Sequence, residues 1–92
     1  MFKRDTSQPA AVTLYTRKGC HLCDEARAEI DRLRAKAEFE LETVDIDSDA
    51  GLQARFNDEV PVVFINGRKA FKYRVEPREF LSRLRTFSGG RR

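Results

Sequence analysis

Two cysteines, Cys20 and Cys23, are the only thiols among the 92 residues, and two residues separate them. An apolar, partly β-branched segment precedes the pair, and a segment of helical periodicity follows it. This spacing at the join of a strand and a helix is typical of a dithiol redox motif. The free N–H groups and positive dipole end of a helix N-terminus stabilise a thiolate and so lower the pKa of the thiol. We therefore predict that Cys20 is the attacking sulfur and that Cys23, one turn along, is the resolving sulfur.

Other uses of the two cysteines fit the sequence less well. A structural zinc site needs four ligands, and the single histidine, His21, lies between the cysteines. Haem attachment requires a histidine directly after the second cysteine, where Asp24 stands. Two alternatives remain: a metal or iron–sulfur carrier that uses Cys20 across a dimer, and a redox-silent binding module. For the main interpretation we expect no metal and no organic cofactor.

Composition limits the class of protein and its partners. Charged residues make up 36% of the chain, and the net charge of +3 is too small to indicate nucleic-acid binding. No apolar run reaches the length of a membrane span or of a signal peptide. We expect a monomer in the cytoplasm, where disulfides are usually transient, with no membrane or nucleic-acid partner.

The hydrophobic pattern predicts seven elements. Strands are expected over residues 10–16, 39–46, 60–65 and 68–73, and helices over 21–36, 50–56 and 77–87. Asn66-Gly67 is the signature of a two-residue hairpin turn with both residues at positive φ. Residues 1–9 are expected to form a flexible arm and residues 88–92 a flexible tail, so that a single domain spans 10–87.

This order predicts an α/β fold with a four-stranded mixed sheet and helices on both faces. The first strand–helix–strand unit should be a right-handed crossover between parallel strands. The last two strands should form an antiparallel hairpin, whose lysines and arginines suit an exposed edge.

Three segments of the sequence carry a resemblance to a known family. They are Leu14-Tyr15-Thr16-Arg17-Lys18-Gly19-Cys20-His21-Leu22-Cys23, Val44-Asp45-Ile46-Asp47 and Val60-Pro61-Val62-Val63-Phe64-Ile65-Asn66-Gly67. In this order they resemble the thioredoxin fold (βαβαββα), and most closely glutaredoxins and the small glutaredoxin-like proteins of bacteria. The resemblance implies a thiol–disulfide oxidoreductase that acts on protein or low-molecular-weight disulfides.

The resemblance also implies roles for single residues. Pro61 would follow a cis peptide bond beside the dithiol, with the backbone of Val60 turned towards it to pair with an extended substrate. Arg17 would lower the pKa of Cys20 or meet a substrate carboxylate. Apart from the resemblance, His21 follows the nucleophile at the helix start, where its cationic form would favour the thiolate.

The chain departs from glutaredoxins after its fourth strand. Glutaredoxins carry Gly-Gly and an acidic residue there and hold one end of glutathione with backbone N–H groups, whereas this chain has Tyr73-Arg74-Val75-Glu76. Because the fourth strand runs back towards the dithiol, we expect Tyr73 and Arg74 to lie near Cys20 and contact substrate. We also expect glutathione to be bound weakly.

Overall fold

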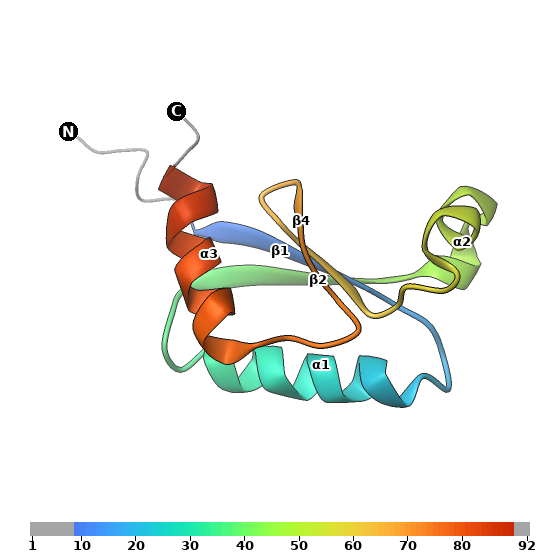
Figure 1. Ribbon diagram of the computed structural model, residues 1–92, viewed down its shortest axis with the longest axis horizontal. Coiled ribbons are helices and arrows are strands. Elements are labelled where there is room, and N and C mark those ends of the chain that lie inside the picture. Colours follow the sequence, from blue (N-terminus) through green and yellow to red (C-terminus); the bar gives the residue numbers. More distant parts are fainter. Residues whose placement is uncertain (1–8, 90–92) are drawn as a thin grey trace.

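The computed structural model describes residues 9–89, so the expected arm lies outside the described residues except for Pro9. Figure 1 shows helices arranged around one sheet. The elements in chain order are β1 (Ala10–Thr16), α1 (His21–Leu33), β2 (Phe39–Asp45), the short 3-10 helix η2 (Ile46–Ser48), α2 (Ala50–Phe56), β3 (Val62–Ile65), β4 (Arg68–Lys72) and α3 (Pro77–Gly89). Within the described part of the chain, no helix is long and apolar enough to cross a membrane.

The sheet is mixed and has the strand order β2-β1-β3-β4. Strand β1 pairs with β2 in parallel and with β3 in antiparallel, and β3 pairs with β4 in antiparallel. The predicted α/β fold with a parallel first unit and a final hairpin is therefore confirmed. The parallel pairing brings the carboxyl ends of β1 and β2 to the same end of the sheet, beside the start of α1.

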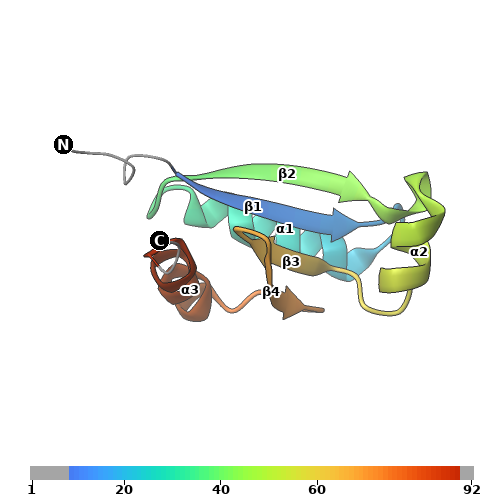
Figure 2. The ribbon, with the colours of Figure 1, turned by 90° about the horizontal axis from the view of Figure 1, so that it is seen from above.

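Side chains alternate along β1 and β3, so that one face of the sheet is buried along its length and the other is covered only near α2. Val12, Leu14 and Val63 point into the core formed with α1 and α3, where Phe80 packs edge-to-face on Phe39. On the opposite face a smaller core forms around helix α2, built from Tyr15, Phe56, Val62 and Phe64. Figure 2 shows α2 at the end of the sheet where β1 and β2 stop. The site end of the sheet is thus packed on both sides.

The hairpin turn confirms its sequence signature. Asn66 and Gly67 have φ values of 50° and 82°, as the two-residue turn requires. Asn66 also ties the turn to β1, because its N–H donates to the carbonyl of Ala11 at 2.8 Å and its Oδ1 accepts from the N–H of Ala11 at 2.9 Å.

Several element ends differ from the sequence-based expectation. Helix α1 ends at Leu33 rather than at residue 36, because the next N–H groups bond three residues back, as in a tight 3-10 turn. Strand β3 begins at Val62, so Val60 and Pro61 precede it, and β4 ends at Lys72 because Tyr73 has a φ of 72°. Helix α3 continues to Gly89 and includes the first two residues of the expected tail, whereas 90–92 lie outside the described residues.

Candidate active site

The dithiol lies at the first turn of α1. Gly19 has a φ of 76°, which lets the chain turn sharply from the loop after β1 into the helix. Cys20 is the N-cap residue, and its Sγ accepts a hydrogen bond from the backbone N–H of Cys23 at 3.1 Å. The two cysteines form a disulfide, with Cα atoms 5.1 Å apart. The sequence-based placement of Cys20 at a helix start is therefore what the structure shows.

The two sulfurs differ in their exposure to solvent. Cys23, in the first turn of α1, is 1% exposed, whereas Cys20 is only partly buried. A molecule that approaches from solvent therefore reaches Cys20 first. Among residues 9–89, no three His, Cys, Asp or Glu side chains form a group that could hold a metal ion.

His21 lies on the outer side of the same helix turn. Its side chain is 91% exposed, and its Nε2 lies 3.9 Å from a carboxylate oxygen of Glu25. The structure therefore places the imidazole in solvent beside an acidic side chain. Its expected influence on the Cys20 thiol stays a prediction.

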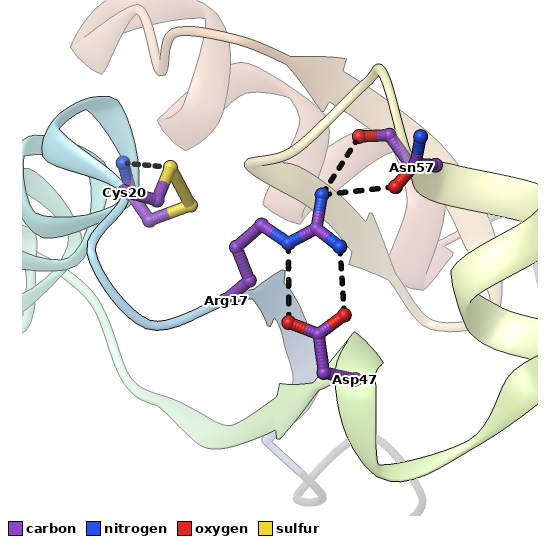
Figure 3. The surroundings of a disulfide bond; sticks show 5 residues. Arg17, Cys20, Asp47 and Asn57 are labelled. Atoms are coloured by element: carbon purple, nitrogen blue, oxygen red, sulfur yellow. Dashed lines mark hydrogen bonds and ion pairs between the residues drawn. A yellow bond between two sulfur atoms is a disulfide. The ribbon is translucent and has the colours of Figure 1, made fainter.

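Arg17 lies at a junction of three chain segments (Figure 3), with its side chain 27% exposed. Its Nε and Nη2 donate to the two carboxylate oxygens of Asp47 at 3.2 and 2.7 Å. Its Nη1 donates to the carbonyl and the side-chain oxygen of Asn57 at 3.2 and 3.0 Å. The hydrogen bond from Arg17 lowers the pKa of Asp47, with a smaller contribution from Gln53, and Asp47 in turn raises the pKa of Arg17. The sequence analysis predicts that the charge of Arg17 acts on the thiolate or on a substrate carboxylate. In the structure this charge is already paired with Asp47.

The sequence analysis did not identify Asp47 and Asn57 as parts of the site. A signal for Asp47 was present, because parallel strands end at the same edge of a sheet. Thr16 is opposite Asp45 in the register of β1 and β2, so the residues that follow each strand are neighbours. Asn57 follows α2, and its place beside Arg17 depends on how that helix packs, which the residue pattern does not reveal.

The turn that precedes β3 lies beside this junction. The Val60–Pro61 peptide bond is cis, as the resemblance implies. Tyr73 holds the turn from the other side: its N–H donates to the carbonyl of Pro61 at 2.7 Å, and its hydroxyl donates to the carbonyl of Asp58 at 3.1 Å. No hydrogen bond from the described residues reaches the backbone N–H or C=O of Val60.

A groove of about 360 Å³ lies between α1 and the loop that joins β4 to α3. Leu22, from inside the dithiol motif, lines one side, and Tyr73, Arg74 and Val75 line the other. Leu22 and Tyr73 are 43% and 42% exposed and are the exposed large apolar side chains among the described residues. The structure therefore brings Tyr73 and Arg74 across a groove from the dithiol helix.

A four-stranded mixed sheet of this order, with a Cys-x-x-Cys pair at the start of its first helix and a cis-proline before β3, defines a thioredoxin-fold protein. Residues 11–85 match the family described as Glutaredoxin-like domain (DUF836), and the chain belongs to this family. The Uncharacterized protein Rv0508 of Mycobacterium tuberculosis is 34% identical over a match that covers 71% of this chain and 72% of that protein.

Solved structures show the same fold. Protein Ne2328 from Nitrosomonas europaea is 32% identical, with a TM-score of 0.74, and the match covers 87% of this chain and 96% of that one. Protein XcR50 from X. campestris is 33% identical, with a TM-score of 0.68 over 82% of this chain and 96% of that one. A chloroplastic thioredoxin z has a TM-score of 0.69 at 9% identity over 92% of this chain and 83% of that one, which shows a shared fold alone.

Proposed function

We propose that the protein is a thiol–disulfide oxidoreductase that uses Cys20 and Cys23 to reduce or exchange disulfides. The observation that carries this proposal is the position of Cys20, a partly exposed N-cap cysteine whose sulfur accepts a backbone N–H and which lies within disulfide reach of a buried second cysteine. A thiolate in this position is stabilised by the same N–H group and by the helix dipole.

The reaction takes place in two exchanges. The thiolate of Cys20 attacks one sulfur of a substrate disulfide, forms a mixed disulfide and releases the other substrate sulfur as a thiolate. Cys23 then loses its proton to solvent, and its thiolate attacks the Sγ of Cys20 and releases the remaining substrate thiolate. The substrate gains two electrons, and the protein is left with the Cys20–Cys23 disulfide that a dithiol donor must reduce.

An extended substrate finds two features beside the dithiol. The backbone N–H and C=O of Val60 are open to pair with a peptide strand. The groove beside the dithiol helix has mixed polar and apolar walls, with the exposed side chains of Leu22 and Tyr73 on its two sides. We infer that peptide disulfides fit this site better than small polar disulfides do.

The charges around the site support a proposal about the electron donor. Arg17 is paired with Asp47, and no side chain of the described residues forms an ion pair with Arg74. Among the residues that line the groove, Arg74 is a cation without an ion pair, and it can meet an anionic substrate from an exposed loop without a rigid backbone cradle. We propose a protein or dithiol donor in preference to glutathione. The cytoplasm suits a dithiol of this kind, because thiols are kept reduced there.

The direct test is a redox titration of the purified protein. Equilibration in dithiol buffers of graded potential, with thiols counted by mass after alkylation, should show one two-electron transition between the Cys20–Cys23 disulfide and the dithiol. The reduced protein should then reduce a peptide disulfide in solution, and the Cys20→Ser variant should not. A reduced protein that leaves every disulfide unchanged would identify a redox-silent binding module instead.

A further inference from the structure

Arg17 joins three segments that the sequence separates widely: the loop that leads to Cys20, the η2 segment and the end of α2 (Figure 3). We propose that Arg17 is a positioning residue that sets the dithiol loop against the turn carrying Val60 and Pro61, and that it does not bind substrate. This inference rests on the proposed function, because it concerns how a docked substrate disulfide is aligned with Cys20.

The hydrogen bonds of Arg17 to the protein leave few of its N–H groups free to bind a substrate. Each of its three guanidinium nitrogens donates to protein oxygen, two to Asp47 and one to Asn57. A guanidinium fork matched to a carboxylate is a rigid connection. A lysine at the same position keeps the charge but loses the fork and cannot reach both partners in the same geometry.

The surroundings of Arg17 are acidic. Asp45 and Asp58 lie close enough to raise its pKa along with Asp47. The charge of Arg17 is therefore compensated by carboxylates of the protein, above all by Asp47, to which it is hydrogen-bonded. Less of this charge is left to attract the carboxylate of an incoming substrate.

The partners of Arg17 are themselves held in place. Asp47 accepts from the side-chain amide of Gln53 at 2.7 Å, and its N–H donates to the side chain of Asp45 at 2.9 Å. Asn57 begins the turn that Tyr73 holds at Asp58 and Pro61. Arg17 and Tyr73 thus fix the turn from two sides, and Arg17 alone of the two also lies on the dithiol loop.

The test compares three disulfides: 2-hydroxyethyl disulfide, which is small and uncharged; an acetylated and amidated peptide disulfide without acidic residues; and glutathione disulfide, which is anionic. The variants are Arg17→Lys, Asp47→Asn and the double variant. Arg27→Lys is the matched control, because Arg27 pairs with Asp31 at 3.2 Å on the exposed side of α1. We expect Arg17→Lys and Asp47→Asn each to slow the peptide disulfide about tenfold, since small misplacements of reacting groups reduce rates steeply.

The same variants should react with 2-hydroxyethyl disulfide at rates within about twofold of the wild type, because a small substrate does not need the turn. The double variant should be no slower than either single variant, and Arg27→Lys should match the wild type throughout. If Arg17→Lys and Asp47→Asn slowed all three disulfides equally, the proposal would be overturned, because the effect would not depend on a substrate docked at the turn. An Asp47→Asn variant that reacts faster with glutathione disulfide while Arg17→Lys reacts more slowly would also overturn it, because Arg17 would then bind the substrate anion.

A readout that does not depend on activity separates this proposal from the proposed function. The amide of Glu59 bonds to the carbonyl of Phe56 at 2.9 Å within the turn. Its hydrogen exchange should accelerate in both Arg17→Lys and Asp47→Asn and stay unchanged in Arg27→Lys. If the wild type reacts with none of the disulfides, the proposed function fails, and unchanged exchange at Glu59 would overturn the positioning role as well.

Discussion

At the scale of single residues, the two cysteines are chemically alike but lie in different surroundings. Cys20 caps a helix and is partly exposed, whereas Cys23 is 1% exposed in the apolar interior. The sequence was sufficient to place both at a helix start, because the strand pattern, the glycine and the helical periodicity adjoin one another. The difference in burial supports the order of attack that we propose.

The assignment of the attacking sulfur predicts opposite behaviour of two serine variants. In Cys23→Ser, a mixed disulfide on Cys20 should accumulate, because no thiol remains to resolve it. In Cys20→Ser, the buried Cys23 should not capture substrate at a comparable rate. Incubation with a peptide disulfide, followed by intact mass measurement, gives the answer. Equal capture by the two variants would show that the roles are assigned wrongly.

The Arg17–Asp47 pair predicts a particular dependence of stability on pH. Hydrogen bonds from Arg17, and then Gln53, lower the pKa of Asp47 in the folded protein. The folded state therefore binds this proton more weakly than the unfolded state does, and the pair stabilises the fold above the usual pKa of an aspartate. That contribution is lost as the pH falls through the lower, folded-state value.

The measurement is urea unfolding of the wild type and Asp47→Asn over a series of pH values. The difference in the free energy of unfolding should be constant between pH 7 and about pH 5 and should shrink below about pH 4, near the usual range of aspartate. In an Arg17→Ala background the same comparison should lose most of its pH dependence. A difference that grows on acidification would contradict the assignment.

At the scale of the elements, local signals predicted some boundaries and missed others. Helix α2 spans residues 50–56 as predicted, with Asp49 as its N-cap, and the hairpin turn forms at Asn66-Gly67 as predicted. The ends of β4 and α1 do not follow from local pattern. Tyr73 takes a positive φ that tyrosine rarely adopts, and its hydrogen bonds to Asp58 and Pro61 hold it there. Contacts between distant segments therefore decide the end of β4, whereas α1 ends in a local 3-10 turn.

The N-cap of α2 provides a test at this scale. The Oδ1 of Asp49 accepts from the N–H groups of Gly51 and Leu52 at 2.7 and 3.2 Å. Asp49→Ala removes both bonds and should reduce the free energy of unfolding by about 0.5–2 kcal/mol, measured in urea. Asp49→Asn keeps an acceptor in place and should lose clearly less. Equal losses in the two variants would mean that the side-chain oxygen does not cap the helix.

At the scale of the whole molecule, the fold could be predicted from sequence, whereas the composition of the site could be predicted only in part. The hydrophobic pattern predicted the order of the elements and the mixed sheet, and the resemblance of three segments to glutaredoxins implied the thioredoxin fold that the structure shows. The partners of Arg17 could not be foreseen in full, because Asn57 reaches it only through the packing of α2 against Tyr15 and Phe64.

The choice of electron donor is a property of the whole site and gives the last prediction. Charge-assisted contacts to a carboxylate contribute about 1.5–3 kcal/mol, so the loss of one weakens glutathione binding roughly ten- to a hundredfold. We expect the oxidised protein to be reduced slowly by glutathione and faster by a dithiol or a protein donor at matched driving force. Stopped-flow reduction by each donor measures this, and efficient reduction by glutathione alone would refute it.

Because Cys23 is buried within reach of Cys20, the protein itself sets the rate at which a mixed disulfide is resolved in the proposed cycle. Any partner captured on Cys20 competes with a thiol carried by the same chain, whose effective concentration does not depend on the partner. A poorly matched partner is therefore released at the rate of attack by Cys23, whatever the properties of that partner. Each such release costs the protein two electrons but leaves no partner attached to Cys20. Once the donor has reduced the disulfide again, the same two sulfurs can react with another partner.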